Sequence, residues 1–152
     1  SALRTLEEII PGLQELHADS GWLYARFESE GKTASFRFDE LSDGQRALIA
    51  LHLLRHVAAT PGSVLALDEP DNYVALAEIQ PWLLDVERAA LKSGGPQVWL
   101  ISHHPEVINL LAPEYGVRFF RDGMGPTRTA PFQAAQQLSA SETVARGWDN
   151  EP

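Results

Sequence analysis

The sequence contains no cysteine, no apolar run of membrane-spanning length and no signal-peptide pattern. Without cysteine there is neither a disulfide framework nor a thiolate metal site, which fits the cytoplasm. A transmembrane helix needs about 18 consecutive apolar residues, and no stretch of this chain approaches that length. We therefore expect a cytoplasmic chain without a membrane segment.

Basic residues are scarce as well: 12 Lys and Arg stand against 21 Asp and Glu, a formal net charge of −9. Phosphate contacts need a basic face, so any contact with nucleic acid is expected to come from other segments of a longer protein. The first residues, Ser1-Ala2-Leu3, lack a methionine, and we expect the chain to be cut from such a protein. Its 152 residues suffice for one lobe with its own core.

A complete P-loop is also missing. Gly31-Lys32-Thr33 matches the end of the pattern Gly-x-x-x-x-Gly-Lys-Ser/Thr, but Arg26 stands where the first glycine is required. A P-loop opens a helix that receives the phosphates, whereas the residues after Thr33 alternate like a strand. We interpret Gly31-Lys32 as a hairpin turn.

The chain instead offers helices and strands in alternation. Residues 13–18, 22–28 and 34–38 predict a small antiparallel meander after a first helix, for which Thr5-Leu6-Glu7-Glu8 supplies a capping box. Helices are predicted over 43–57, 75–92 and 105–111, followed by a closing hairpin from 117–121 and 127–130. Ser139 is predicted to cap a last helix that ends near Gly147, and the tail from Trp148 is expected to fray. The apolar residues expected to face the core are Leu3, Leu6, Ile9 and Ile10 in the first helix, and Leu76, Ile79, Leu83, Val86 and Leu91 in the 75–92 helix.

The central stretch is the apolar run Val64–Leu67, which ends in the adjacent carboxylates Asp68 and Glu69 and then Pro70. Such a run predicts a strand buried on both faces of a mostly parallel sheet. The strand would present both acids at the sheet edge where α/β proteins bind ligands. Buried acids need a compensating cation, usually a metal; the alternative is an ordinary acidic turn that caps the next helix.

Two further stretches flank this strand. Upstream, Ser42 is a good N-cap for a mostly buried helix, on which His52 and His56 are expected to form a solvated edge. Downstream, the predicted buried strand 97–101 ends in Ser102-His103-His104. There is no clear His-x-x-x-His pair beside a carboxylate, so no zinc site is predicted.

Together these stretches resemble the C-terminal half of an ABC-type ATPase. Leu41–Gln45 is similar to the signature motif, Leu67–Pro70 to Walker B, and Ser102-His103 to the switch-histidine loop. The residues in these motifs are more similar to those of the SMC/RecF/OLD-like AAA-family ATPases than to those of transporter subunits. The resemblance covers about the middle two-thirds of the chain and implies an α/β, P-loop NTPase-like lobe. Its parts would be 1–40 (helix and antiparallel strands), 41–130 (motif core) and 131–152 (last helix and tail).

The resemblance also implies a role for each motif residue. Asp68 would hold Mg²⁺, Glu69 would polarise the water that attacks ATP, and the switch histidine would contact the γ-phosphate. His103 matches that histidine better than His104, because it directly follows the serine at the strand end. The residues expected to contact nucleotide are Ser42, Gly44 and Gln45 of the signature motif and Asp71 and Asn72 of the D-loop.

Two departures from the family pattern stand out. Asp43 replaces the usual signature glycine, which argues against a transporter subunit, and Ala75 stands where the D-loop usually carries an aspartate. The sequence thus predicts part of an ATPase head in DNA repair, chromosome maintenance or phage defence. It would be inactive without an N-terminal P-loop-bearing part and would form homodimers of heads around ATP. The alternatives are a transporter's nucleotide-binding subunit and a non-catalytic dimerisation or regulatory lobe.

Overall fold

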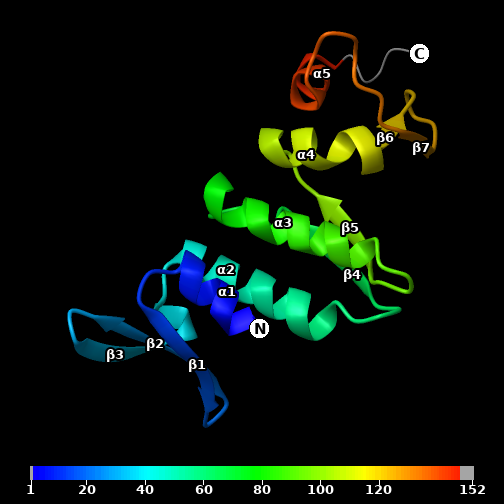
Figure 1. The fold of residues 1–152 in the computed structure, drawn as a ribbon. Coiled ribbons are helices and arrows are strands. Elements are labelled where there is room, and N and C mark those ends of the chain that lie inside the picture. The colour runs from blue at the N-terminus through cyan, green and yellow to red at the C-terminus, as the bar shows by residue number, and fades with distance from the viewer. Residues whose placement is uncertain (1, 148–152) are drawn as a thin grey trace. The chain divides into compact units, whose positions relative to one another are not determined.

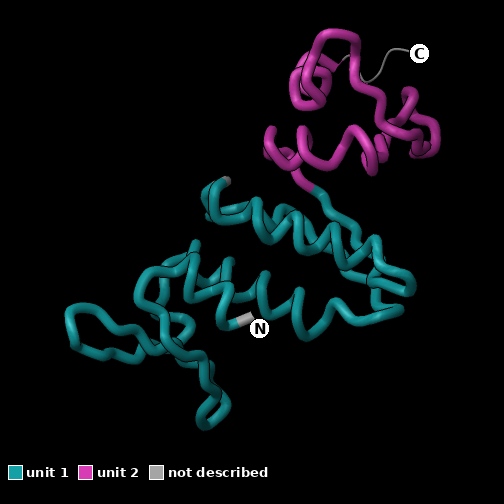
Figure 2. The backbone as a smooth tube through the Cα atoms, viewed as in Figure 1, with its two compact units in different colours: residues 1–101 teal, residues 102–152 magenta. Residues whose placement is uncertain are grey.

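The computed structural model describes residues 2–147, and its ribbon is drawn in Figure 1. The chain divides into two compact units, Ser1–Ile101 and Ser102–Pro152, which Figure 2 colours separately. Each unit is described below by itself. The predicted fraying from Trp148 falls outside the described residues, and the three-part division of one lobe stays a prediction.

The first unit opens with α1 (Ala2–Ile9), in which Leu6 is fully buried; Ile10, directly after the helix, is buried as well. The predicted capping box is wrong, because the helix already begins at Ala2 and Thr5 lies inside it. After α1 the chain turns at Gly12, whose φ is +80°. A Cβ there would lie 2.7 Å from the carbonyl oxygen of Glu28, so only glycine lets the turn approach the sheet this closely.

The predicted meander is confirmed as an antiparallel sheet in the order β1-β2-β3. Its strands are β1 (Leu13–Asp19), β2 (Trp22–Ser29) and β3 (Lys32–Arg37). The register places Leu16 opposite Ala25 and Ala25 opposite Phe36, so one face of the sheet is apolar. Ala25 is buried, whereas Phe36 on the edge strand is 42% exposed.

A short 3-10 turn, η1 (Phe38–Glu40), leads to α2 (Asp43–Leu53), which continues as the π-helical turn η2 (Leu54–Ala58). α2 packs against α1 on one side and against α3 (Leu76–Ala90) on another. Trp82 of α3 is buried, and its indole N–H donates to the carbonyl oxygen of Leu51 at 2.9 Å. This buried hydrogen bond joins α3 to α2.

Two predictions about these helices are wrong. His52 is buried, at 3% exposure, because α3 covers the side of α2 on which it lies; His56 is exposed as predicted. In α3, Ile79, Leu83 and Val86 face the core, but Leu91 is 66% exposed. The helix ends at Ala90, so Leu91 is its C-cap and no longer follows the buried face. The side chain of Leu76 lies outside the described part.

The central strand exists and is parallel to its neighbour, as predicted. β4 (Val64–Asp68) pairs with β5 (Gln97–Ile101), with Asp68 opposite Ile101. The predicted burial of this strand on both faces is wrong, however. Alternate residues on one face are half-buried, and α3 packs on β5, while the other face is open. The large apolar side chains on the open face are Val64 (62% exposed), Trp99 (49%) and Ile101 (63%).

The second unit contains α4 (Pro105–Tyr115), the hairpin β6 (Val117–Arg121) and β7 (Thr127–Pro131), and α5 (Ala140–Arg146). The predicted closing hairpin and the Ser139 cap of the last helix are confirmed, and Gly147 ends that helix in a left-handed conformation. The helix predicted over 105–111 is one turn longer. α4 packs on α5, where Thr143 is fully buried.

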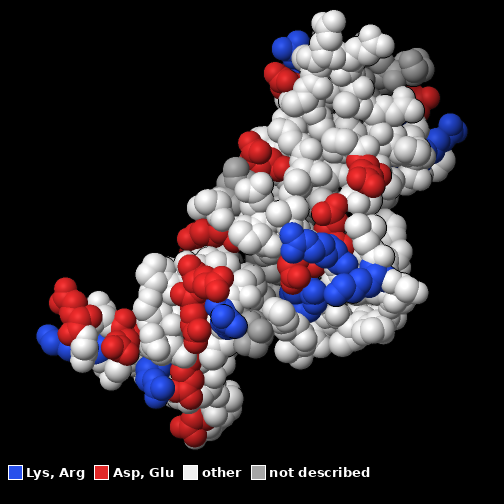
Figure 3. Space-filling view, viewed as in Figure 1, with Lys and Arg blue, Asp and Glu red and all other residues white. Residues whose placement is uncertain are grey.

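The surface in view in Figure 3 carries acidic side chains over much of the first unit, with basic ones among them. Several Lys and Arg side chains lie together in one part of this face, with acidic side chains beside them. Within residues 2–147, no helix combines the length and apolar character needed to cross a membrane.

Candidate functional site

The two predicted carboxylates lie at the carboxyl end of β4, in the first unit. Asp68 is the exposed last residue of the strand, and Glu69 leaves it with φ +47°. The backbone N–H of Glu69 donates to the carbonyl oxygen of Ile101 at 2.8 Å, which ties this turn to β5. A left-handed φ is uncommon for a residue with a long side chain, and such strain is often found at functional sites.

Two hydrogen bonds within the turn link Asn72 to Glu69. The backbone N–H of Asn72 donates to the carbonyl oxygen of Glu69 at 3.1 Å, and the Asn72 side-chain amide donates to Glu69 Oε2 at 2.8 Å. Asp71 is buried, at 5% exposure, and its Oδ1 has no hydrogen-bond partner among the described residues. Three residues predicted to serve one site, Glu69, Asp71 and Asn72, therefore share a single turn.

The predicted signature residues lie at the start of α2. Ser42 is the N-cap: its Oγ accepts from the N–H of Gln45 at 3.3 Å, and Gln45 Oε1 accepts from the N–H of Ser42 at 3.2 Å. These reciprocal bonds form a capping box, the structural role considered for Ser42 from the sequence. The unusual Asp43 forms an ion pair with Arg46 on the next turn, which offsets its negative charge.

Gly44 connects the two motifs. A Cβ at this position would lie 2.8 Å from the carbonyl oxygen of Tyr73, so the first turn of α2 touches the turn that begins at Glu69. Tyr73 is 77% exposed and has φ +69°. The structure thus brings the signature residues together with the D-loop-like segment.

A hollow of about 370 Å³ lies beside this contact. Its polar lining comes from Ser42, Gln45 and Glu78 and its apolar lining from residues that include Ile10 and Leu48. The sequence analysis did not assign Tyr73 or the end of α1 to the site, although both line this hollow. No spacing rule connects residues 9–11 with residues 42–48, since only packing of α1 on α2 brings them together.

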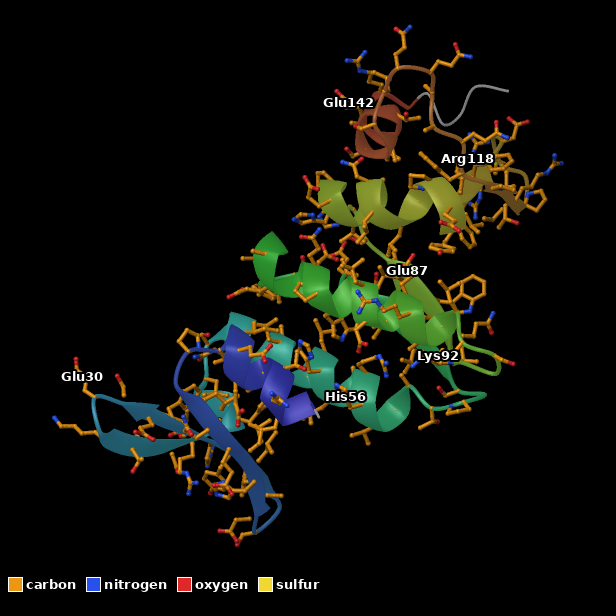
Figure 4. The ribbon with its side chains drawn as sticks, in the orientation of Figure 1. Glu30, His56, Glu87, Lys92, Arg118 and Glu142 are labelled. Carbon is orange, nitrogen blue, oxygen red and sulfur yellow. The ribbon has the colours of Figure 1, made fainter. Side chains whose placement is uncertain are left out.

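The residues of the incomplete P-loop form a β-hairpin turn and the start of a strand. Lys32 is the first residue of β3 and pairs with Ser29 across a two-residue turn. Glu30 and Gly31 occupy that turn with φ +52° and +75°, as a tight hairpin requires. In Figure 4 Glu30 projects from the tip of this hairpin. The hairpin interpretation is confirmed.

His103 and His104 belong to the second unit. His104 is the N-cap of α4: its Nδ1 accepts from the N–H of Glu106 at 3.2 Å, and its own N–H donates to Ser102 Oγ at 3.0 Å. His103 precedes the cap and is exposed. The capping bond occupies Nδ1 of His104. The assignment of His103 as the switch histidine stays a prediction.

Among residues 2–147, no cluster of three or more His, Asp or Glu side chains is arranged to hold a metal ion. Magnesium in nucleotide enzymes needs fewer, because it is held by one or two carboxylates, the phosphates and water. Asp68, exposed at the end of a parallel strand, fits that requirement.

A mixed α/β chain with acids at the end of a parallel strand is consistent with a P-loop NTPase-like fold. The family model described as "AAA domain, putative AbiEii toxin, Type IV TA system" matches residues 4–109, and the chain belongs to this family. The match includes every candidate site residue named above. No curated protein matches the chain.

The fold is also that of a solved chain from work on the structural biochemistry of ATP-driven dimerization and DNA stimulated activation of SMC ATPases. That comparison has a TM-score of 0.58 and covers 98% of this chain and 87% of the other, at 14% identity. At this identity, the similarity shows a shared fold.

Proposed function

We propose that this chain is the part of an ABC-type ATPase head, of the SMC/RecF/OLD-like kind, that carries the signature motif, Walker B and the switch histidine. A separate P-loop-bearing part of the same ATPase would bind most of the ATP. Two complete heads would then enclose ATP between them, each contacting the nucleotide held by the other.

The observation that carries this proposal is the open face of the β4–β5 sheet. Parallel sheets are almost always covered on both faces, yet Val64, Trp99 and Ile101 are about half exposed or more. Among residues 2–147, no further strand pairs with either outer edge of this two-stranded sheet. A further strand beside β5 and a helix packed on it would cover this face, close to Asp68 at the end of the neighbouring strand β4.

The chemistry of the site residues agrees with ATP hydrolysis. Asp68 would bind Mg²⁺ together with the phosphates, and Glu69 would orient and deprotonate the attacking water. The first N–H groups of α2 have no intrahelical acceptors and lie at the positive end of the helix dipole. Around Gly44, this helix start would receive a γ-phosphate from the facing head. Hydrolysis would release the phosphate and open the pair of heads.

The first test is calorimetric titration of Mg-ATP into the 152-residue chain, alone and after addition of the P-loop-bearing part. We expect no micromolar binding to the chain alone and magnesium-dependent binding to the complex. Tight binding to the chain alone that disappears on Asp68→Ala would overturn the proposal. In the complex, Glu69→Gln should retain ATP and stop turnover, whereas a non-catalytic lobe would be indifferent to that change.

A further inference from the structure

The side chain of Asn72 holds the carboxylate of Glu69 at 2.8 Å from its amide nitrogen to Oε2. We infer that Asn72 is a positioning residue: it sets the orientation of Glu69 toward the attacking water rather than binding the nucleotide. This inference rests on the proposed function, since it needs Glu69 to be the base.

The turn that carries both residues is anchored at each end. At its start the N–H of Glu69 is bound to Ile101 of β5, and at its end Val74 is buried, at 8% exposure. Between them, the backbone N–H of Asn72 binds the carbonyl oxygen of Glu69. Asn72 therefore cannot shift along the strand axis independently of Glu69, and its amide reaches a carboxylate fixed to the same short turn.

A general base must place a lone pair within hydrogen-bond reach of one proton, and small displacements are costly. A glutamate has three side-chain torsions, so its carboxylate plane is free to rotate unless a neighbour fixes it. The Asn72 amide donates to Oε2 and so restricts the rotation of the carboxylate and the directions that Oε1 can take. Only a side chain with an N–H or O–H donor can do this at position 72.

Aspartate at position 72 separates this role from a purely steric one. It has nearly the shape of asparagine but offers no donor at neutral pH, and its charge repels that of Glu69. A nucleotide-binding role for Asn72 would instead change the affinity for ATP. The two roles therefore predict changes in different kinetic constants.

The contact itself is testable in the 152-residue chain. In nuclear magnetic resonance spectra, Glu69→Ala should move the side-chain amide signals of Asn72 and leave those of Asn109 in place. Asn109 serves as the control because its Oδ1 accepts from the N–H of Ser141 in the second unit. Unmoved Asn72 signals would contradict the inference without involving ATP hydrolysis.

The functional test uses the ATPase assembled with its P-loop-bearing part. We expect Asn72→Asp to lower kcat by 10-fold or more at unchanged KM, and Asn72→Gln, which restores a donor, to recover part of the loss. In a Glu69→Gln background, which retains ATP without turnover, Asn72→Asp should leave ATP retention unchanged, since a positioning residue acts through the base and not on the nucleotide. The matched change Asn109→Asp keeps its acceptor oxygen and should leave kcat unchanged.

The outcomes distinguish failure of the proposed function from failure of the positioning role of Asn72 alone. If Glu69→Gln leaves turnover intact, the proposed function fails and the positioning role fails with it. If Glu69→Gln stops turnover but Asn72→Asp matches the wild type, only the positioning role is overturned. A rise in KM at constant kcat would make Asn72 a nucleotide ligand and would also overturn it.

Discussion

Gly44, in the first turn of α2, stands so close to Tyr73 that a Cβ at position 44 would lie 2.8 Å from the Tyr73 carbonyl oxygen. The opposing atom belongs to the backbone of the turn that starts at Glu69, so it cannot move away without moving that turn. The packing of two motif segments therefore depends on the absence of one methyl group.

We predict that Gly44→Ala destabilises the chain by about 1–3 kcal/mol, the range expected for overpacking a well-packed site. The midpoint and slope of a urea unfolding curve measure this. Gly125→Ala is the control, because its nearest contact, the Asp122 carbonyl oxygen, is 3.0 Å away in the β6–β7 turn and the steric conflict is smaller. Equal losses at the two positions would contradict the close contact at Gly44.

The Gly44–Tyr73 contact is a feature of the candidate site that could not be predicted from the sequence. Local pattern was enough for the carboxylates: an apolar run followed by Asp68-Glu69 predicted a parallel strand with acids at its end, and β4 is such a strand. It was also enough for Ser42 as an N-cap. The contact of Gly44 with Tyr73 joins residues 29 positions apart, which no periodicity encodes. It follows from packing alone.

Burial was the least predictable property. His52 was expected to form a solvated edge of the helix together with His56, but it is buried at 3% exposure where α3 packs on α2. The open face of β4 and β5 shows the opposite error: four apolar residues in a row predict a strand covered on both faces, but one face is exposed. A run of apolar residues indicates that both faces of a strand could be buried. Whether both are buried depends on which other elements pack against the strand.

His52 gives a prediction about pH. Its burial lowers the pKa of the imidazole below the ordinary value of 6.5; the nearby His56 lowers it further and Asp85 opposes this. The unfolded chain then binds more protons than the folded chain as the pH falls below about 6.5, so acid destabilises the fold. Stability should be fully present above that pH and decline below it.

Urea unfolding at pH 7.5 and pH 5.5 measures this effect. His52→Leu removes the titrating group and should lessen the loss of stability between the two pH values. His56→Gln should lessen the loss only in part, because it removes one cause of the lowered His52 pKa and leaves the burial of His52, the larger cause, in place. An unchanged pH dependence in His52→Leu would show that other groups are responsible.

Thr143 is predicted to be a main determinant of stability in the second unit. Its side chain is fully buried, and its Oγ1 both donates to the Ser139 carbonyl oxygen at 2.9 Å and accepts from the N–H of Ala135 at 3.1 Å. Thr143→Val keeps the shape but leaves the Ala135 N–H without its acceptor, which should cost about 1–3 kcal/mol. Thr129→Val, at an exposed position of β7, should change the free energy of unfolding by less than about 0.5 kcal/mol.

The open face of β4 and β5 supplies the sharpest test of whether another protein segment covers it. Trp99 is 49% exposed in this chain, so Trp99→Glu should leave the unfolding curve of the 152-residue chain nearly unchanged. In the complex with the P-loop-bearing part, the same glutamate would be buried without a partner. We therefore expect a loss of affinity of at least 10-fold in calorimetric titration of one part into the other.

Trp22→Glu is a matched control, because Trp22 is 50% exposed but lies on the β1–β3 meander. Equal affinities for the Trp99 variant and the wild type would mean that this face stays open in the assembled protein, and the main support for a missing P-loop-bearing part would be lost.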